Sequence, residues 1–221
     1  MLPSQYPEVK PYKDLTELFK YQVDMQFDDL RTILQLPVDE HRLTAGCNLA
    51  AAMIMFNLIS GASVCLFEVK RKNLSRSERF KSVLKHFYPW QGEELSAQEC
   101  VDCIYKDARN PLAHSFGLNY PKKTRFEVTL QKGPLSLEQI LELENTPIRP
   151  TWTSSTIIPR RKRSIGTKVV DLSIPSLFWG IHRMFHALIS DSVQATTANK
   201  LAGQFKNHWL TFVSDLGSGI P

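Results

Sequence analysis

Residues 50–59 read AAAMIMFNLI, and they form the middle of a longer stretch, residues 43–67, that contains no charged side chain. A stretch of this length could cross a bilayer as a helix. Two asparagines and two serines interrupt it, however, and Gly61 ends its most apolar part. This composition favours a helix over about residues 38–60 that is buried on all sides at the centre of a bundle. A membrane helix is the alternative, but no membrane partner is expected.

Amphipathic helical patterns flank this stretch on both sides. Apolar residues recur at helical spacing over residues 12–35, where Asp14 is a candidate N-cap and Pro37 ends the pattern. Two further helices are expected to begin at Ser75 and Ser96, since serine is a favoured N-cap. The remaining predicted helices cover residues 134–145, a segment that begins at Pro175, and residues 197–215.

The period of the apolar residues changes from helical to alternating after residue 120. RFEVTL (125–130) alternates strictly between apolar and polar residues, which predicts a strand. TWTSSTII (151–158) and IGTKVVDL (165–172) are two further candidate strands. The predicted fold class is therefore mainly α: a helical bundle with a small antiparallel β-sheet insertion.

The apolar faces of the last two predicted helices need the earlier helices as partners. This requirement predicts a single domain over residues 1–221. Its helical core is expected to contain residues 12–120 and 173–215, with a β-rich insertion at residues 121–172.

The composition is that of an ordinary globular protein, with 43% hydrophobic and 22% charged residues among 221. A net charge of +5 permits an anionic partner without demanding one. Residues 1–14 are polar and show no secretory pattern, and the four cysteines are typical of reduced thiols. The expected location is the cytoplasm.

A short motif, RNPLAH, places an arginine, an asparagine and a histidine within six residues: Arg109, Asn110 and His114. Asparagine is a good N-cap, and Pro111 is favoured at the first helical position. The sequence therefore predicts that a helix breaks near Arg109 and that a new helical turn starts at Pro111. Such a break would allow Arg109 and His114 to converge on one pocket. The guanidinium is suited to phosphate oxygens, and a neutral histidine is suited to take a proton.

These residues resemble the active-site signature of the HEPN superfamily. That signature is an arginine, commonly followed by a polar residue such as asparagine, and a histidine four to six residues after the arginine. The resemblance implies an α-helical bundle, often a homodimer, whose catalytic residues are Arg109, Asn110 and His114. Many members are metal-independent endoribonucleases of toxin–antitoxin or antiviral systems. The resemblance therefore implies RNA as substrate, an antitoxin protein as a partner, and neither a metal nor a cofactor. It does not extend to the β-rich segment.

The alternative function is a non-catalytic helical module that dimerises, scaffolds or senses, in which Asn110 caps a helix and Arg109 and His114 are structural. RNA cleavage by attack of a ribose 2′-OH on the adjacent phosphate is the preferred interpretation. In that reaction His114 would be general base or acid, and Arg109 would stabilise the charge on the phosphoryl oxygens.

Two basic clusters are candidate nucleic-acid-binding elements, because runs of lysine and arginine can hold a phosphate backbone. A solvated surface is the equal alternative for both. The two clusters consist of Lys70, Arg71 and Lys72, and of Arg160, Arg161, Lys162 and Arg163.

A CxxC pair and an HxxxH pair could together supply four zinc ligands. The pairs are Cys100 with Cys103, and His182 with His186. Both lie within predicted amphipathic helices and lack the tight turn of a zinc knuckle, so helical core or edge positions are favoured and no metal is expected.

Overall fold

The computed structural model describes the backbone of residues 15–36, 47–66, 74–114, 124–129, 134–161 and 168–190. Side chains are described for residues 20–36, 47–63, 74–113, 134–159 and 170–188. The predicted helix over residues 197–215 and the candidate N-cap Asp14 lie outside these ranges.

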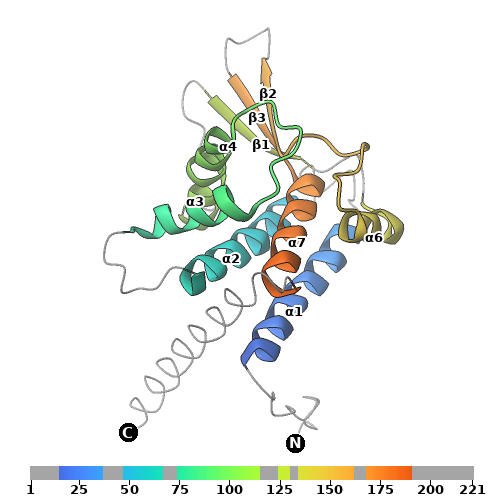
Figure 1. The fold of residues 1–221 in the computed structure, drawn as a ribbon. Coiled ribbons are helices and arrows are strands. Elements are labelled where there is room, and N and C mark those ends of the chain that lie inside the picture. Colours follow the sequence, from blue (N-terminus) through green and yellow to red (C-terminus); the bar gives the residue numbers. More distant parts are fainter. Residues whose placement is uncertain are drawn as a thin grey trace, which may run out of the picture.

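The described part of the chain is mainly helical, which confirms the predicted fold class. Figure 1 shows α2 and α7 in the middle of the molecule, with α1 and α6 on one side and α3 and α4 on the other. The helical elements are α1 (Leu15–Gln35), α2 (Asn48–Leu66), α3 (Arg76–Phe87), α4 (Ala97–Cys103), η1 (Ile104–Arg109), α5 (Asn110–His114), α6 (Leu137–Asn145) and α7 (Ile174–Ser190).

The uncharged stretch forms α2, which packs against α1, α3 and α7. Three expectations for it were wrong. The helix begins at Asn48, ten residues after the predicted start. The helix continues through Gly61 to Leu66, because a glycine costs a helix only about 1 kcal/mol and packing on three neighbours outweighs that cost. The helix is also open on one face, where Met53 is 43% exposed; Ala50 precedes it and Asn57 and Gly61 follow it at helical spacing. Apart from Met53, the residues at these positions are small or polar and leave little apolar surface to bury.

The final described helix, α7, is deeply buried over its first half. Every residue from Ile174 to Ile181 is buried, and the Trp179 indole N–H donates to the Thr146 carbonyl at 3.0 Å. The described buried hydrophobic side chains form one cluster from α1 to α7, which includes Ile157 and Leu172 from the sheet. These strand residues thus share a core with the helices.

Three helices start with a reciprocal capping box, in which the N-cap serine accepts a hydrogen bond from the third helical residue and that residue's side chain bonds back to the serine N–H. Ser75 and Ser96 cap α3 and α4 in this way, as the sequence predicts, with glutamates as partners. Ser136 caps α6 with a glutamine as partner.

The sheet lies at one end of the molecule in Figure 1 and has the strand order β1-β3-β2. The strands are β1 (Thr124–Thr129), β2 (Ile157–Arg161) and β3 (Lys168–Ser173). β2 and β3 form the predicted antiparallel pair. β1 instead pairs with β3 in parallel, because the chain between them passes through α6 and then through β2, which runs opposite to both strands. Alternation within one strand carries no information about its direction.

The predicted strand over residues 151–158 was placed too early in the sequence, since β2 runs from Ile157 to Arg161. It begins only at Ile157, because Thr153 makes a turn in which both its N–H and its hydroxyl donate to the Pro150 carbonyl. α6 packs on α1 and α7, and the N–H of Leu135 donates to the Leu34 carbonyl at 2.9 Å. Part of the predicted insertion therefore contacts the helical core directly, while its boundaries stay a prediction.

Candidate functional site

The RNPLAH motif lies in a helical segment that runs without interruption through α4, η1 and α5. Asn110 has α-helical dihedral angles, φ −64° and ψ −49°, and its N–H donates to the Tyr105 carbonyl. An N-cap residue would have extended dihedral angles and would accept hydrogen bonds through its side chain. The predicted helix break at Arg109 and the predicted N-cap role of Asn110 were therefore wrong.

A π-helical turn, η1, stands where the break was predicted, and the helix continues through it. The hydrogen bond from Asn110 to Tyr105 spans five residues, one more than in an α-helix. Pro111, which follows, has no N–H to place in an α-helical ladder. The core also favours continuation, since Ile104, Ala108 and Leu112 are buried at spacings of four residues. A break would have turned Leu112 away from the side that buries the other two.

Arg109 lies at the end of η1 with its guanidinium over two aromatic rings. Its Cζ atom is 5.9 Å from the ring centroid of Phe80 on α3 and 5.6 Å from that of Tyr105 on η1. Its Nη1 donates to the Oδ1 atom of Asn110 at 3.1 Å. A permanently charged fork held by ring faces and a neighbouring amide is suited to bind an oxyanion, because its orientation is partly fixed beforehand.

A second cation contacts the same aromatic ring. The Nζ atom of Lys81 on α3 is 5.4 Å from the Tyr105 centroid and binds the Asp102 carboxylate at 2.6 Å. Gln98 donates to the other carboxylate oxygen at 2.9 Å. These hydrogen bonds, and the nearby charges of Lys81 and Lys85, lower the pKa of Asp102. The carboxylate is therefore ionised at neutral pH.

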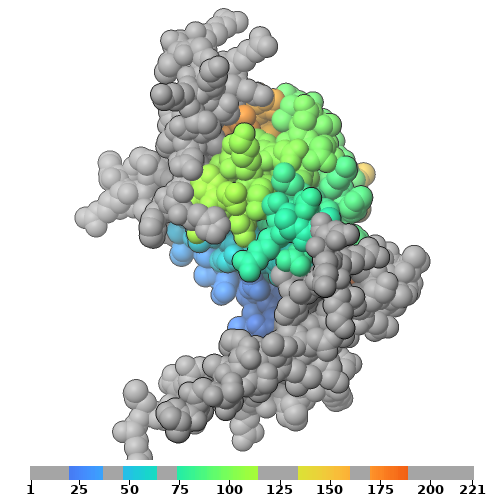
Figure 2. Space-filling view, turned by 90° about the vertical axis from the view of Figure 1, so that its left-hand side faces the viewer, coloured from blue at the N-terminus to red at the C-terminus, as the bar shows by residue number. Residues whose placement is uncertain are grey.

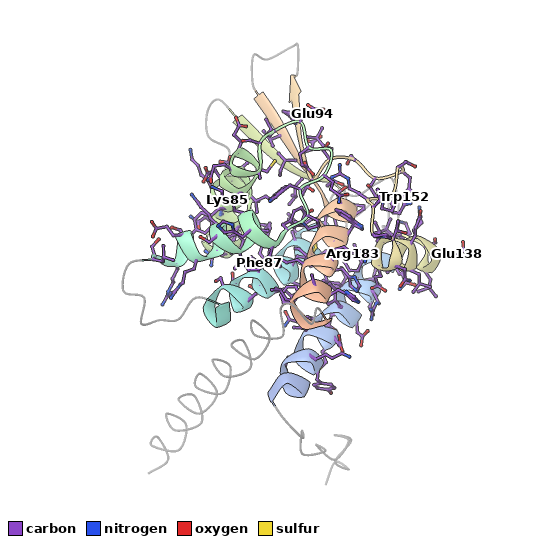
Figure 3. All side chains as sticks on the ribbon, viewed as in Figure 1. Lys85, Phe87, Glu94, Glu138, Trp152 and Arg183 are labelled. Atoms are coloured by element: carbon purple, nitrogen blue, oxygen red, sulfur yellow. The ribbon has the colours of Figure 1, made fainter. Side chains whose placement is uncertain are left out.

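The residues around this ring come from three elements, α3, α4 and η1, that share one face of the molecule. Figure 2 shows the teal-green surface of α3 beside the yellow-green surface of residues 100–114. Figure 3 places Lys85 between α3 and α4. This face therefore carries Lys81, Lys85 and Arg109, and the Asp102 carboxylate pairs with Lys81 there.

The other predicted site residues fall wholly or partly outside the described side chains. His114 ends α5, but its side chain is not among those described, so its convergence with Arg109 stays a prediction. The same holds for both basic clusters. The backbone places Arg160 and Arg161 at the end of β2, whereas Lys162, Arg163, Lys70, Arg71 and Lys72 lie outside the described residues.

The candidate zinc ligands are not brought together. Within the described ranges, no group of three or more histidine, cysteine or acidic side chains could hold a metal ion. Burial raises the pKa of the Cys100 thiol to about 12. Burial, and then the charges of Arg31 and Arg183, lowers the pKa of His182 to about 4. His182 contacts the ring of Phe27, with centroids 5.0 Å apart, so it is a packed histidine at the α1–α7 contact.

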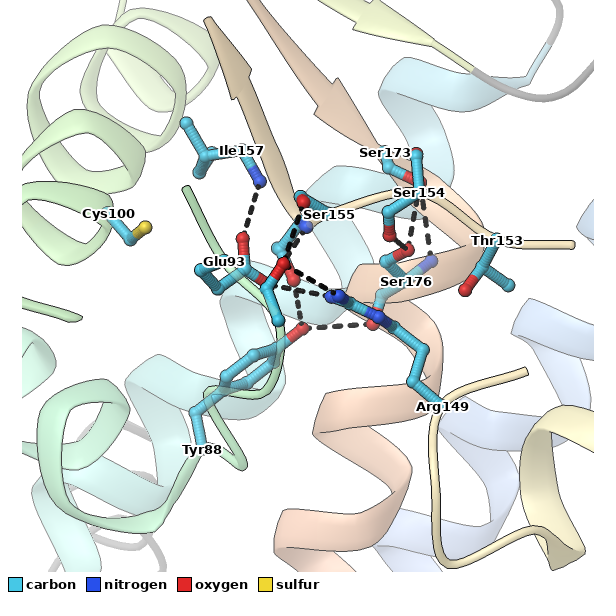
Figure 4. A network of polar contacts seen from close by, with 12 residues as sticks. Tyr88, Glu93, Cys100, Arg149, Thr153, Ser154, Ser155, Ile157, Ser173 and Ser176 are labelled. Carbon is cyan, nitrogen blue, oxygen red and sulfur yellow. Dashed lines mark hydrogen bonds and ion pairs between the residues drawn. The ribbon is translucent and has the colours of Figure 1, made fainter. Parts of the chain in front are cut away.

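Figure 4 shows a buried polar network that the sequence reasoning missed. The Glu93 carboxylate binds Arg149 at 2.7 Å and accepts the N–H groups of Thr156 and Ile157. The hydroxyl of Tyr88 pairs with that of Thr156 at 2.8 Å. This network ties the segment after α3 to the segment before β2, so we assign it to the fold and not to the site.

Sequence reasoning also missed the aromatic support of Arg109. The predicted helices that begin at Ser75 and Ser96 contain Phe80 and Tyr105, but the contact of these rings with a guanidinium was not predicted. A signal was present, since Tyr105 precedes Arg109 by four residues and therefore lies on the same side of a helix. The contribution of Phe80 depends on how α3 packs, which no local pattern gives.

Comparison of the chain with models of protein families, with curated proteins and with solved structures found no match. None of the helices in the described ranges has the length and apolar character needed to span a membrane.

Proposed function

We propose that this protein binds RNA and cleaves it without a metal ion, as a HEPN-like endoribonuclease of a toxin or defence system. The observation that carries the proposal is the prepositioned pair Arg109–Asn110, in the order R-N-x3-H, at a π-helical turn. Single π turns within α-helices occur frequently at functional sites. The mainly helical fold is compatible with this family.

The proposed reaction needs a base, an acid and a donor to the phosphoryl oxygens. The ribose 2′-oxygen attacks the adjacent phosphorus, the bond from phosphorus to the 5′-oxygen breaks, and a cyclic phosphate and a free 5′-hydroxyl result. His114 takes the 2′ proton as general base or gives a proton to the leaving 5′-oxygen as general acid. Arg109 donates to the non-bridging oxygens, where charge builds up in the transition state.

A homodimer is part of the proposal, because in the family the arginine and histidine of two subunits face each other. The full chain should then sediment at micromolar concentration near twice its mass of 25.3 kDa. A monomer at every concentration would rule out a site shared between subunits. An antitoxin protein is the further partner that the family resemblance suggests.

The decisive experiment is a cleavage assay on single-stranded RNA in the presence of a chelator. His114→Ala should reduce the rate by roughly 10²–10⁴-fold, which is typical for loss of a proton-transfer group. The matched control is His86→Ala, which changes an exposed histidine on α3 and should cleave like the wild type. Arg109→Lys keeps the charge, loses the planar fork and should also lower the rate.

A non-catalytic scaffold or sensor module is the second candidate function. The position of Arg109 over Phe80 and Tyr105 supports this second function, because a stacked arginine can contribute to packing without binding a substrate. The two functions differ in the cleavage assay. If no RNA is cut by the wild type and His114→Ala melts at the wild-type temperature, the interaction module is the better assignment.

A further inference from the structure

We infer that Lys81 is a second phosphate-binding residue of the site around Arg109, and that Asp102 neutralises it until RNA displaces the carboxylate. This inference rests on the proposed RNA-binding function. It goes beyond the motif because Lys81 belongs to α3, outside the RNPLAH segment.

The first step is the distance between the two cations. The Nζ atom of Lys81 and the Cζ atom of Arg109 lie 5.4 and 5.6 Å from one point, the centroid of the Tyr105 ring. They are therefore no more than about 11 Å apart. Two cations at such a separation on one face can contact phosphates that are close together along a single strand.

The second step concerns the ring itself. Aromatic side chains in proteins that bind single strands usually offer a face on which a base stacks. The Tyr105 ring is half-buried and two cations stand over it, so its faces serve to hold Lys81 and Arg109. The ligand class that follows is single-stranded RNA recognised through its phosphates, with little preference for base identity.

The third step is the state of Lys81 without RNA. Its ammonium group binds Asp102 at 2.6 Å, and the exposed fractions of the two side chains are 32% and 48%. A partly exposed ion pair of this kind contributes little to stability, so a phosphate can replace the carboxylate at little cost. Asp102 then repels an approaching phosphate and competes with it for the same ammonium group.

The test is binding of a labelled single-stranded RNA 20-mer to the full chain, followed by anisotropy over a series of salt concentrations. Lys81→Gln should weaken binding several-fold and reduce the slope of log K against log salt by about 0.7, the value for one contact to a single-stranded phosphate. Asp102→Asn should tighten binding several-fold. Lys20→Gln changes an exposed lysine on α1 and is the matched control. Lys81→Arg should bind like the wild type.

The outcomes separate this inference from the proposed function. Equal affinities for Lys81→Gln and Lys20→Gln, with Arg109 still required for cleavage, would overturn the inference and leave the nuclease in place. Weaker binding by Asp102→Asn would overturn the competitive role of the carboxylate. No RNA binding by the wild type would overturn both proposals. If Lys81→Gln does not fold, the RNA affinity of Asp102→Asn tests the inference: tighter binding than the wild type supports it, and equal or weaker binding overturns it.

Discussion

Gly180 occupies a position in α7 where a single methyl group should disrupt the core. A Cβ atom built there would overlap the outer ring atoms and the hydroxyl of Tyr88. The Tyr88 ring cannot move away from such a methyl group without losing other contacts. The Tyr88 hydroxyl is hydrogen-bonded to the Thr156 hydroxyl at 2.8 Å and to the Ser176 carbonyl at 2.9 Å. The Tyr88 ring also contacts the ring of Trp90, with centroids 4.3 Å apart.

Three effects set the size of the change for Gly180→Ala. Alanine stabilises a helix interior by about 1 kcal/mol relative to glycine. Overpacking of a tight core costs about 1–3 kcal/mol. Displacement of Tyr88 leaves a buried hydroxyl without its partners, which costs about 1–3 kcal/mol more. The net expectation is a loss of about 3 kcal/mol in the free energy of unfolding. For a chain of this length that is a melting temperature lower by roughly 6–12 °C.

The assay is thermal and urea unfolding of the full chain, followed by circular dichroism. Gly61→Ala is the matched control, because Gly61 is also helical and a Cβ atom there would meet nothing within 4 Å. It should stabilise the protein by about 0.5–1 kcal/mol, through helix propensity alone. The two glycine-to-alanine changes are thus expected to have opposite signs.

A second background identifies Tyr88 as the cause. Tyr88→Leu removes the outer ring atoms that the new methyl group would overlap. In that background, Gly180→Ala should be neutral or stabilising. An equal loss in both backgrounds would place the clash elsewhere. A neutral Gly180→Ala in the wild type would refute the packing of Tyr88 against α7.

Three further outcomes are expected. Asn110→Ala should change the free energy of unfolding by no more than about 0.5 kcal/mol and should still slow RNA cleavage, because Asn110 orients Arg109 and caps no helix. A loss near 1 kcal/mol would instead indicate that Asn110 is an N-cap. Arg149→Met should cost about 3–5 kcal/mol in urea unfolding by leaving the buried Glu93 carboxylate unpaired, and a loss below 1 kcal/mol would contradict this. Burial lowers the pKa of His182 from 6.5 to about 4, so the unfolded chain binds a proton at a higher pH than the folded chain does. The free energy of unfolding should therefore fall by about 2–3 kcal/mol as the pH is lowered from 6.5 to 4. His182→Leu should remove that part of the pH dependence, and an unchanged profile would contradict the assignment.

Helix positions could be predicted from the sequence where caps and apolar period agree. Ser75 and Ser96 begin α3 and α4 as expected, because each also has a glutamate three residues later that completes a capping box. The buried residues Phe27, Leu30 and Leu34 of α1 follow the predicted helical spacing. These signals lie within a few residues of one another, so a local pattern is sufficient to find them.

Features that depend on distant contacts could not be predicted in this way. The parallel pairing of β1 with β3 joins residues 124–129 to residues 168–173, and no property of either strand sets their relative direction. The Glu93–Arg149 pair joins loops 56 residues apart. Both residues look like ordinary surface charges in the sequence, and they become buried only because the turn before β2 packs on the segment that follows α3.

The helix around Arg109 shows how a local signal loses to packing. Asparagine followed by proline favours the start of a helix, and such a start would satisfy the backbone locally. The same residues also belong to a buried row, Ile104, Ala108 and Leu112, whose burial contributes about 1.5–3 kcal/mol for each large side chain. A π turn keeps this row in the core. It also leaves Asn110 beside Arg109, free of a capping role, so its Oδ1 atom can accept the guanidinium hydrogen bond. The correction to the helix boundary therefore strengthens the link between these two residues.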